Sequence, residues 1–167
     1  PANIISPATP SNFSPSLLSA PPSPTYSANS AITKVGNDVY LLYSNNLQEP
    51  TLVKLDCTTT TPSVTASVSL TGEVFGYAPD VFVDTDDDYV YICLSGLSGL
   101  SFSYAVFDTD LNPILPTTVI ETGVGAKYSS SIFKTNGTLY VAYSRPFSQT
   151  HNTFYDVRIQ SIDSSGT

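Results

Sequence analysis

Positive charge is scarce in this sequence. Its 167 residues include six Lys and Arg against fourteen Asp and Glu, which gives a formal net charge of -8 at pH 7. This balance repels phosphate backbones and anionic lipid surfaces, and no local cluster of basic residues offsets it. We therefore expect no nucleic-acid partner and no binding to anionic membranes.

The sequence also lacks a long apolar run. A helix that spans a bilayer requires ~20 consecutive, mostly apolar residues, and no stretch approaches that length, so we expect no membrane insertion. There is no initiating Met and no basic leader followed by an apolar segment. The last four residues, "SSGT" (164–167), are typical of a turn. These features favour a processed product or a segment of a longer protein.

Helical periodicity is absent as well, and neither Met nor Trp occurs. No window of helical length keeps an apolar stripe without a Pro, a Gly or a β-branched run that breaks it. Instead, short apolar runs rich in Tyr, Phe, Val, Ile and Thr alternate with Asn, Asp, Gly, Pro and Ser. Because 41% of the residues are hydrophobic, the chain can bury one core, and we predict a single all-β domain.

Residues suited to catalysis are few. The only histidine, His151, lies in the variable segment "SRPFSQTHNTFY", where we interpret it as a surface residue. The sequence has no nucleophile, His and acid in a known order, no metal-binding spacing of Cys and His, and no phosphate-binding Gly loop. For the two cysteines, two alternatives stay open. Cys93 lies in a predicted buried strand and fits a free, packed thiol, and a disulfide to Cys57 is the alternative.

What the sequence does contain is a threefold repeat. The segments "DVYLLYS" (38–44), "DYVYICLS" (88–95) and "TLYVAYS" (138–144) can be aligned with their central tyrosines in register. Two further sets of residues recur in the same order, one before and one after these segments: Tyr26, Tyr77 and Tyr128, and Asp56, Asp108 and Asp163. Three landmarks in a constant order indicate an internal repeat of about 50 residues.

Each repeat is predicted to form four antiparallel strands, which is the size of one β-propeller blade. In the second repeat we place these strands at 80–84, 89–95, 102–108 and 114–120. The repeat domain is predicted at 26–167, with units at about 26–76, 77–127 and 128–167. The third unit ends before its fourth strand.

Residues 1–25 are rich in Pro and Ser. We interpret them either as an extended arm with polyproline character or, through "SPSLLS" at 14–19, as a closing outer strand. Three blades do not close a ring, because propellers use ~4 to 8. We therefore expect the fold to be completed by further blades of a parent chain or by other copies of itself, or the repeats to stack in an open, fibre-like array.

The segment "YAPDVFVDTDDDYVYICLS" (77–95) resembles the first half of the blades in sialidase-like and related extracellular β-propellers. The resemblance covers the chain from about residue 26 to the end, and a pattern of strands and turns carries it. It does not include an Asp-box of the form Ser-x-Asp-x-Gly-x-x-Trp. It does not include the arginine cluster that holds a sialic acid carboxylate either, because Arg145 and Arg158 are the only arginines. Sialidase activity is therefore not implied.

The acidic run at 84–88 is a candidate metal site. Asp84, Asp86 and Asp88 alternate with other residues, and calcium loops use oxygen ligands at this spacing, although the Gly and the downstream acid of a full loop do not follow. The alternative is a solvated hairpin turn, because the sister repeats place "KVGND" (34–38) and "KTNGT" (134–138) there, and Asn-Gly favours hairpins. "DTDLN" (108–112) is a second, weaker calcium candidate. We expect no cofactor other than calcium.

Three tyrosines form the candidate ligand-binding site: Tyr26, Tyr77 and Tyr128. Each precedes the predicted innermost strand of its blade, near the central channel, where phenol rings offer faces for sugar stacking and hydroxyls for hydrogen bonds. The alternative is that they pack between the blades. Glu73 and Asp80 are two acids that would meet across a propeller funnel, as the carboxyl pair of a glycoside hydrolase does.

Two sequons, at Asn12 and Asn136, predict glycosylation if the chain is secreted, with Asn136 on an exposed turn. The acidic, lysine-poor surface favours an extracellular, cell-surface or virion-surface location. We predict a structural and recognition module rather than an enzyme, a component of a fibre or appendage with glycan as its ligand class. The alternative is a glycoside hydrolase-type propeller domain that uses carboxylates of the inner strands.

Overall fold

The computed structural model describes residues 30–44, 49–70, 79–95, 101–122, 130–148 and 151–162. In these ranges the regular structure consists of eleven strands, and the all-β class predicted from the sequence is confirmed. None of these ranges holds a helix of the length and hydropathy that crossing a membrane requires.

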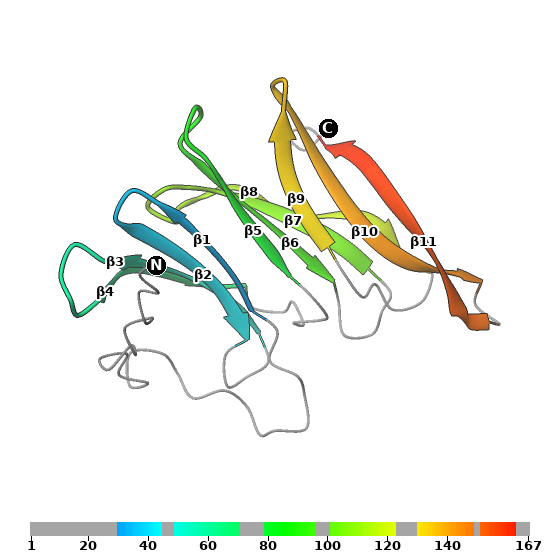
Figure 1. The fold of residues 1–167 in the computed structure, drawn as a ribbon, viewed down its shortest axis with the longest axis horizontal. Coiled ribbons are helices and arrows are strands. Elements are labelled where there is room, and N and C mark those ends of the chain that lie inside the picture. The colour runs from blue at the N-terminus through cyan, green and yellow to red at the C-terminus, as the bar shows by residue number, and fades with distance from the viewer. Residues whose placement is uncertain are drawn as a thin grey trace, which may run out of the picture.

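The strands form three antiparallel sheets in which neighbours in sequence are neighbours in space (Figure 1). The first sheet contains β1 (Ser30–Val35), β2 (Asp38–Ser44), β3 (Pro50–Asp56) and β4 (Ser63–Ser69). The second contains β5 (Asp80–Asp84), β6 (Tyr89–Ser95), β7 (Ser101–Asp108) and β8 (Pro113–Thr122). The third contains β9 (Ser130–Thr135), β10 (Thr138–Ser148) and β11 (His151–Ile162). Each sheet is a meander of the kind that forms a propeller blade, and the four strands predicted for the second repeat coincide with β5 to β8.

The register between the first two strands of each sheet defines which positions are equivalent. Tyr40, Tyr91 and Tyr140 lie opposite Thr33, Phe82 and Phe133, respectively. The residues just before these partners are therefore equivalent to one another, namely Ile32, Val81 and Ile132. The residues just after them include Lys34 and Lys134, which occupy the same place in the first and third sheets.

Left-handed backbone conformations close the hairpins between the first and second strands of each sheet. Asn136 and Gly137 have φ values of 50° and 76°, and positive φ at both central residues is what a type I′ turn needs. In the first sheet Gly36 has a φ of 58°, and in the second Asp88 has a φ of 57°, which Asp adopts more readily than most residues with a side chain. The prediction that the run at 84–88 is a hairpin turn is therefore confirmed.

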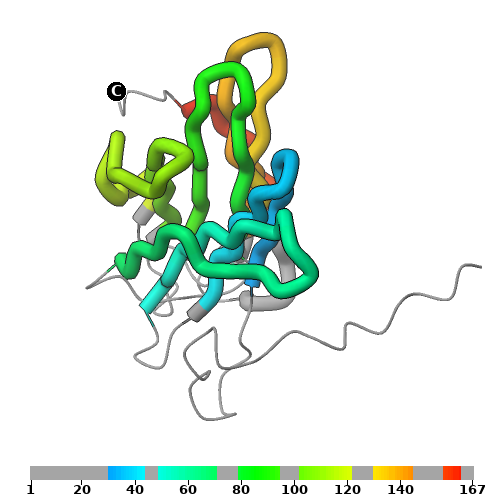
Figure 2. Tube along the Cα trace, turned by 90° about the vertical axis from the view of Figure 1, so that its left-hand side faces the viewer, coloured from blue at the N-terminus to red at the C-terminus, as the bar shows by residue number. Residues whose placement is uncertain are grey.

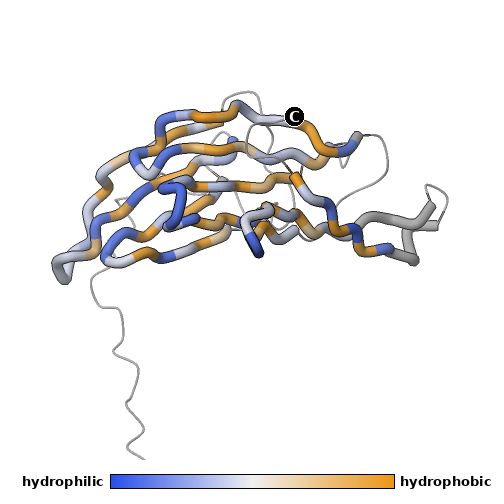
Figure 3. Tube along the Cα trace, turned by 90° about the horizontal axis from the view of Figure 1, so that it is seen from above, coloured by the Kyte–Doolittle hydropathy of each residue, from blue (hydrophilic) through white to orange (hydrophobic). Residues whose placement is uncertain are grey.

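Two apolar cores lie between successive sheets. The core between the first two sheets contains Tyr40, Leu42, Leu52, Val81, Val83, Val90, Ile92, Leu94, Ala105, Phe107 and Leu111. The core between the second and third sheets contains Tyr91, Cys93, Phe102, Tyr104, Val106, Ile132, Leu139, Val141 and Tyr143. Because successive side chains of a strand point to opposite faces, β6 serves both cores. Figure 3, coloured by hydropathy, shows hydrophobic residues interspersed with hydrophilic ones along the strands. The second sheet is thus buried on both faces, as a blade between two neighbours is.

The first strands of the three sheets lie next to one another. β5 contacts both β1 and β9, and Figure 2 shows the hairpins that begin with these strands side by side. The later strands of each sheet spread away from them. β1, β5 and β9 therefore occupy the position of the inner strands of a propeller.

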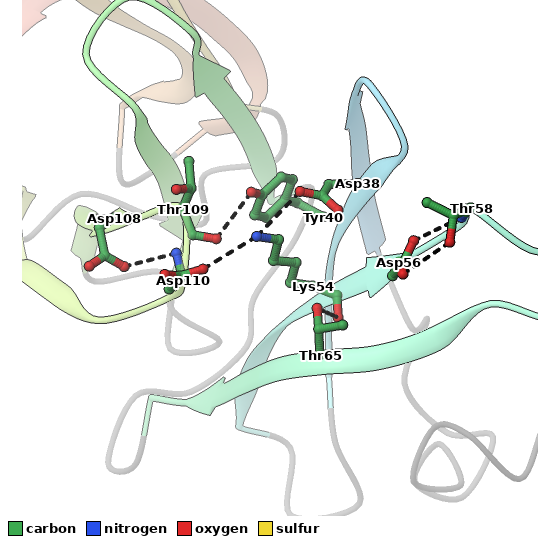
Figure 4. Close-up of polar contacts among 9 residues, drawn as sticks. All are labelled: Asp38, Tyr40, Lys54, Asp56, Thr58, Thr65, Asp108, Thr109 and Asp110. Carbon is green, nitrogen blue, oxygen red and sulfur yellow. Dashed lines mark hydrogen bonds and ion pairs between the residues drawn. The ribbon is translucent and has the colours of Figure 1, made fainter.

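Polar contacts also join the first two sheets (Figure 4). The Nζ of Lys54 lies 3.3 Å from Asp38 Oδ2 and 3.4 Å from Oδ1 of Asp110, which belongs to the turn after β7. The same ammonium lies 5.9 Å from the centre of the Tyr40 ring, and the Tyr40 hydroxyl donates to the carbonyl oxygen of Thr109 at 3.1 Å. Burial raises the pKa of Tyr40, although the Lys54 charge opposes this. The turn at 108–112 therefore attaches the second sheet to the first.

Candidate functional site

A carboxylate links two inner strands at the end where β5 begins. Asp80 is the first residue of β5. Its Oδ2 accepts a hydrogen bond from the backbone N of Ile132 at 2.9 Å and another from Oγ of Ser131 at 3.0 Å, both in β9. Its Oδ1 accepts from the backbone N of Val81 at 2.9 Å. We call these four residues, Asp80, Val81, Ser131 and Ile132, the inner-strand mouth.

The contacts of Asp80 determine which chemistry it can perform. Three donors aimed at one carboxyl group suit its ionised form, which has lone pairs on both oxygens and no proton to give. The equivalent positions in the first and third sheets hold Ala31 and Ser131, so the second sheet alone supplies a carboxylate at this end of the described inner strands. The Asp80 side chain is therefore held in one orientation by donors from β5 and β9.

Several predicted site residues lie outside the described ranges, and the predictions about them stay predictions. These are the three tyrosines of the candidate ligand site, the acid proposed to face Asp80, and one sequon: Tyr26, Tyr77, Tyr128, Glu73 and Asn12. The second sequon residue, Asn136, is exposed on its hairpin turn. His151 is the first residue of β11.

A groove lies at the opposite end of β5 and β9, between two hairpin turns. It has a volume of about 500 Å³ and is lined by residues 82–87 and 134–137. The Nζ of Lys134 donates to carboxylate oxygens of both Asp84 and Asp87. The Asp84 side chain is 5% exposed, and its Oδ1 accepts from the backbone N of Asp86 at 3.0 Å. The acidic turn of the second sheet is thus attached to the third sheet by a lysine.

The pKa values of this cluster follow from these contacts. Burial alone would raise the pKa of Asp84, but the hydrogen bonds from Lys134 and from the backbone of Asp86 outweigh it and hold this pKa below its ordinary value. The hydrogen bonds to Asp84 and Asp87 raise the pKa of Lys134. Both groups therefore stay charged at neutral pH.

The metal candidates take different roles in the two turns. At 84–88, the carboxylate of Asp84 is directed to Lys134, and Asp86 contributes a backbone N–H. At 108–112, Asp108 Oδ1 accepts from the backbone N of both Asp110 and Asn112 at 2.9 and 2.8 Å. This carboxylate therefore stabilises the backbone of its own turn. Across the described ranges, no group of three or more His, Cys, Asp or Glu side chains could hold a metal ion. Calcium binding at Asp84, Asp86 and Asp88 stays a prediction.

Lys134 is a residue of this cluster that was not among the predicted site residues. Its signal was the lysine that opens both "KVGND" (34–38) and "KTNGT" (134–138). Lys134 lies about one repeat after the acidic run, and adjacent blades bring strands one repeat apart, here β5 and β9, into contact. A positive charge one repeat from a negative run therefore indicates a contact between blades.

Both cysteines are free, and Cys93 is fully buried. The prediction of a packed thiol is therefore confirmed, and the alternative of a disulfide with Cys57 is wrong. Burial raises the pKa of the Cys93 thiol to about 12, whereas Cys57 is half-buried directly after β3.

We expect the two thiols of the native protein to react at very different rates with an aromatic disulfide reagent at pH 8. Since the thiolate is the reactive form, Cys93 should react at least ~100-fold more slowly than Cys57, and unfolding in denaturant should make the two rates alike. A Cys57→Ser variant should lose the fast phase only. Two fast phases in the native protein would contradict the packing of the second core.

The comparisons with known proteins bear on the fold. No family model matches the sequence, and no curated protein is significantly similar to it. Among solved structures, an α-L-arabinofuranosidase from Clostridium thermocellum superimposes with a TM-score of 0.52 at 21% identity, over 83% of this chain and 48% of that one. An exo-β-1,3-galactanase from Phanerochaete chrysosporium, solved with β-1,3-galactotriose, superimposes with a TM-score of 0.50 at 11% identity, over 80% of this chain and 35% of that one.

These similarities establish a propeller-type fold, as the repeats predicted. The chain spans about half or less of the length of these two solved structures. Both are glycan-cleaving enzymes by name, and neither is a sialidase. The finer resemblance to sialidase-like propellers therefore stays a prediction.

Proposed function

We propose that this chain forms part of a glycan-cleaving propeller and that the glycan binds at the inner-strand mouth. The observation that carries the proposal is the carboxylate of Asp80, fixed by three hydrogen bonds at the start of an inner strand. The fold neighbours support it, because an arabinofuranosidase and a galactanase both act on glycans. The proposal favours the hydrolase alternative over a fibre component.

The expected reaction explains why a fixed charge is useful there. Glycoside hydrolysis passes through a positively charged, oxocarbenium-like transition state and uses two carboxyl groups near the scissile bond. An ionised carboxylate that cannot reorient stabilises this developing charge without cost at the moment of reaction. Asp80 takes this electrostatic and positioning role, and proton transfer falls to a second acid, for which Glu73 is our candidate.

The same end of the inner strands would supply the contacts to the sugar. Tyr77 and Tyr128 precede β5 and β9 in sequence, and their rings are our candidates for stacking on pyranose or furanose faces. The acidic surface and the sequon at Asn136 are consistent with an extracellular protein that meets its glycan outside the cell.

The test uses the whole chain with arabinan-derived and β-1,3-galactan-derived oligosaccharides, and it measures sugar release together with binding by calorimetry. We expect cleavage, and we expect Asp80→Asn to lower kcat/KM by about 100-fold, because the fixed charge is lost while the shape is kept. Asp110→Asn is the matched control, since its side chain is 81% exposed in a turn away from the mouth, and it should leave kcat/KM unchanged.

Three outcomes would count against the proposal or in favour of its alternative. Binding without cleavage by the folded wild-type chain would favour the recognition module. No binding to any glycan tested, or full activity of Asp80→Asn, would contradict the proposal.

A further inference from the structure

In each sheet, the face on the side of the preceding sheet is here called the leading face, and the face on the side of the following sheet is called the trailing face. On the leading faces, Val81 and Ile132 are 5% and 3% exposed, because each packs against the sheet before it. Ile32 is the equivalent residue of the first sheet, and it is 69% exposed. The first sheet therefore presents, at β1, an apolar position that the other two sheets bury.

The trailing faces show the same contrast at the other end of the array. Tyr91 is 1% exposed under the third sheet, and its ring stacks on Phe82 with centroids 6.2 Å apart. The third sheet carries the equivalent pair, Phe133 and Tyr140, stacked at 5.6 Å. Phe133 nevertheless remains 37% exposed, because no described sheet follows it.

The outer strand extends this open trailing face. In β11, Val157 and Ile159 lie opposite Ser144 and Ala142 of β10, on the same face as Tyr140. They are 72% and 66% exposed. Apolar side chains at this exposure, gathered on one face, mark an interaction surface.

We propose that two copies of this chain associate head to tail, with β1 and the leading face of the first sheet of one copy packed on the trailing face of the third sheet of the other. Each chain already forms this type of contact twice, between its own sheets. The leading face of the first sheet and the trailing face of the third sheet are the two faces that have no such contact among the described sheets. Val53 and Leu55, on the leading face of β3, are already buried within the chain, so the contact centres on the inner strands. Two reciprocal contacts give a ring of six sheets, within the ~4 to 8 of known propellers.

One difference from the contact between the second and third sheets gives the interface a specific signature. Between the second and third sheets, Lys134 pairs with Asp84. In the contact between copies, Lys34 takes the place of Lys134, and Thr135 takes the place of Asp84 by register. The contact between copies therefore lacks the ion pair that joins the second and third sheets within one chain.

The first experiment measures the mass of the whole chain by sedimentation over a range of concentrations. The wild-type chain should form a dimer that dissociates on dilution. Ile32→Glu and Ile159→Glu should each raise the dissociation constant by at least ~100-fold, because each buries an unpaired charge in the contact. Val119→Glu, at a position of β8 that is 52% exposed, should leave it unchanged. All substituted residues are exposed in the single chain, so circular dichroism should show an intact fold.

Mixing the two variants tests the head-to-tail geometry. A 1:1 mixture of Ile32→Glu and Ile159→Glu should recover a dimer, since one of its two contacts pairs two unaltered faces. Thr135→Asp should tighten the wild-type dimer by about 10-fold by supplying a partner for Lys34, and Lys34→Ala should abolish that gain.

Three results would overturn the proposal. If the chain is monomeric at every concentration, the two open faces instead pack against further blades of a longer protein. A dimer that resists Ile32→Glu but not Ile159→Glu would show two trailing faces in contact. A mixture that stays monomeric would exclude the reciprocal contact. None of these results depends on whether the chain cleaves glycans.

Discussion

Replacement of Asp84 with alanine is expected to lower the free energy of unfolding by about 2–4 kcal/mol. Its side chain is 5% exposed and connects two blades, because it accepts from Lys134 of the third sheet as well as from the backbone N of Asp86. Hydrogen bonds to charged groups contribute about 1.5–3 kcal/mol, and removing one partner of a buried pair costs more than the pair contributes net. Denaturant unfolding of the wild-type and variant chains measures this difference.

Asp87→Ala is the matched control. Asp87 pairs with the same ammonium, but its side chain is 49% exposed, and exposed ion pairs contribute about 0–1 kcal/mol. An equal loss of stability in the two variants would show that burial of Asp84 does not determine the strength of the contact between the blades.

The same contact predicts a pH dependence. The pKa of folded Asp84 lies below its ordinary value of 3.8, so the folded state binds this proton less readily than the unfolded state does. The stabilisation is therefore complete above about pH 5 and is lost as the pH falls through the folded pKa. The difference in unfolding free energy between the wild type and Asp84→Asn should shrink below about pH 4. A difference that stays constant from pH 7 to pH 3 would contradict the assignment.

Phe102→Ala should lower the free energy of unfolding by about 3–5 kcal/mol, the usual effect of removing a buried aromatic ring. Phe102 is fully buried in β7, and its ring stacks on Tyr143 of β10 with centroids 4.4 Å apart. Its loss leaves a cavity between the second and third sheets, where neither sheet can collapse without disturbing its own ladder. Thermal or denaturant unfolding at concentrations where the chain is monomeric measures the change.

Phe133→Ala provides the comparison, since this ring also stacks on a tyrosine but is 37% exposed on the open trailing face. We expect a loss of about 1 kcal/mol, because little buried area disappears. If Phe102→Ala costs no more than Phe133→Ala, the second core does not hold the two sheets together as we describe.

The strands were predictable because their signals are local. Alternating side chains and Asn-Gly or Gly-Asn turns specify a hairpin without reference to the rest of the chain. The same pattern in three aligned segments made the prediction of hairpins stronger. The turn at 84–88 contains both a local and a long-range feature. Its position was predicted from the sister repeats, whereas its attachment to Lys134 joins residues 50 positions apart.

The candidate site was harder to predict for the same reason. Asp80 was named as an acid of the inner strands, but its hydrogen bonds to Ser131 and Ile132 cross from one blade to the next, and no periodicity within a blade encodes them. The spacing of the run at 84–88 singled out Asp84, Asp86 and Asp88, but it did not indicate which acid of the run is buried. Burial separates them, since Asp84 is enclosed and Asp87 is half-exposed.

Leu111 illustrates a different limit. It has a φ of 65° and yet is 5% exposed within the first core. Left-handed conformations are costly for residues with a large apolar side chain, so no propensity scale would place a leucine there. The hydrogen bonds of Asp108 to the backbone of the same turn hold this conformation, and the burial of the leucine offsets its strain.

The position of the glycan is the central claim, and backbone amide chemical shifts measure it directly. Titration of the labelled chain with β-1,3-galactotriose and with arabino-oligosaccharides should shift the amides of Asp80, Val81, Ser131 and Ile132, and the shifts should saturate together. The amides of residues 84–87 and 134–137, at the other end of β5 and β9, should change little. Shifts confined to that groove, or none at the inner-strand mouth at saturating sugar, would contradict the account.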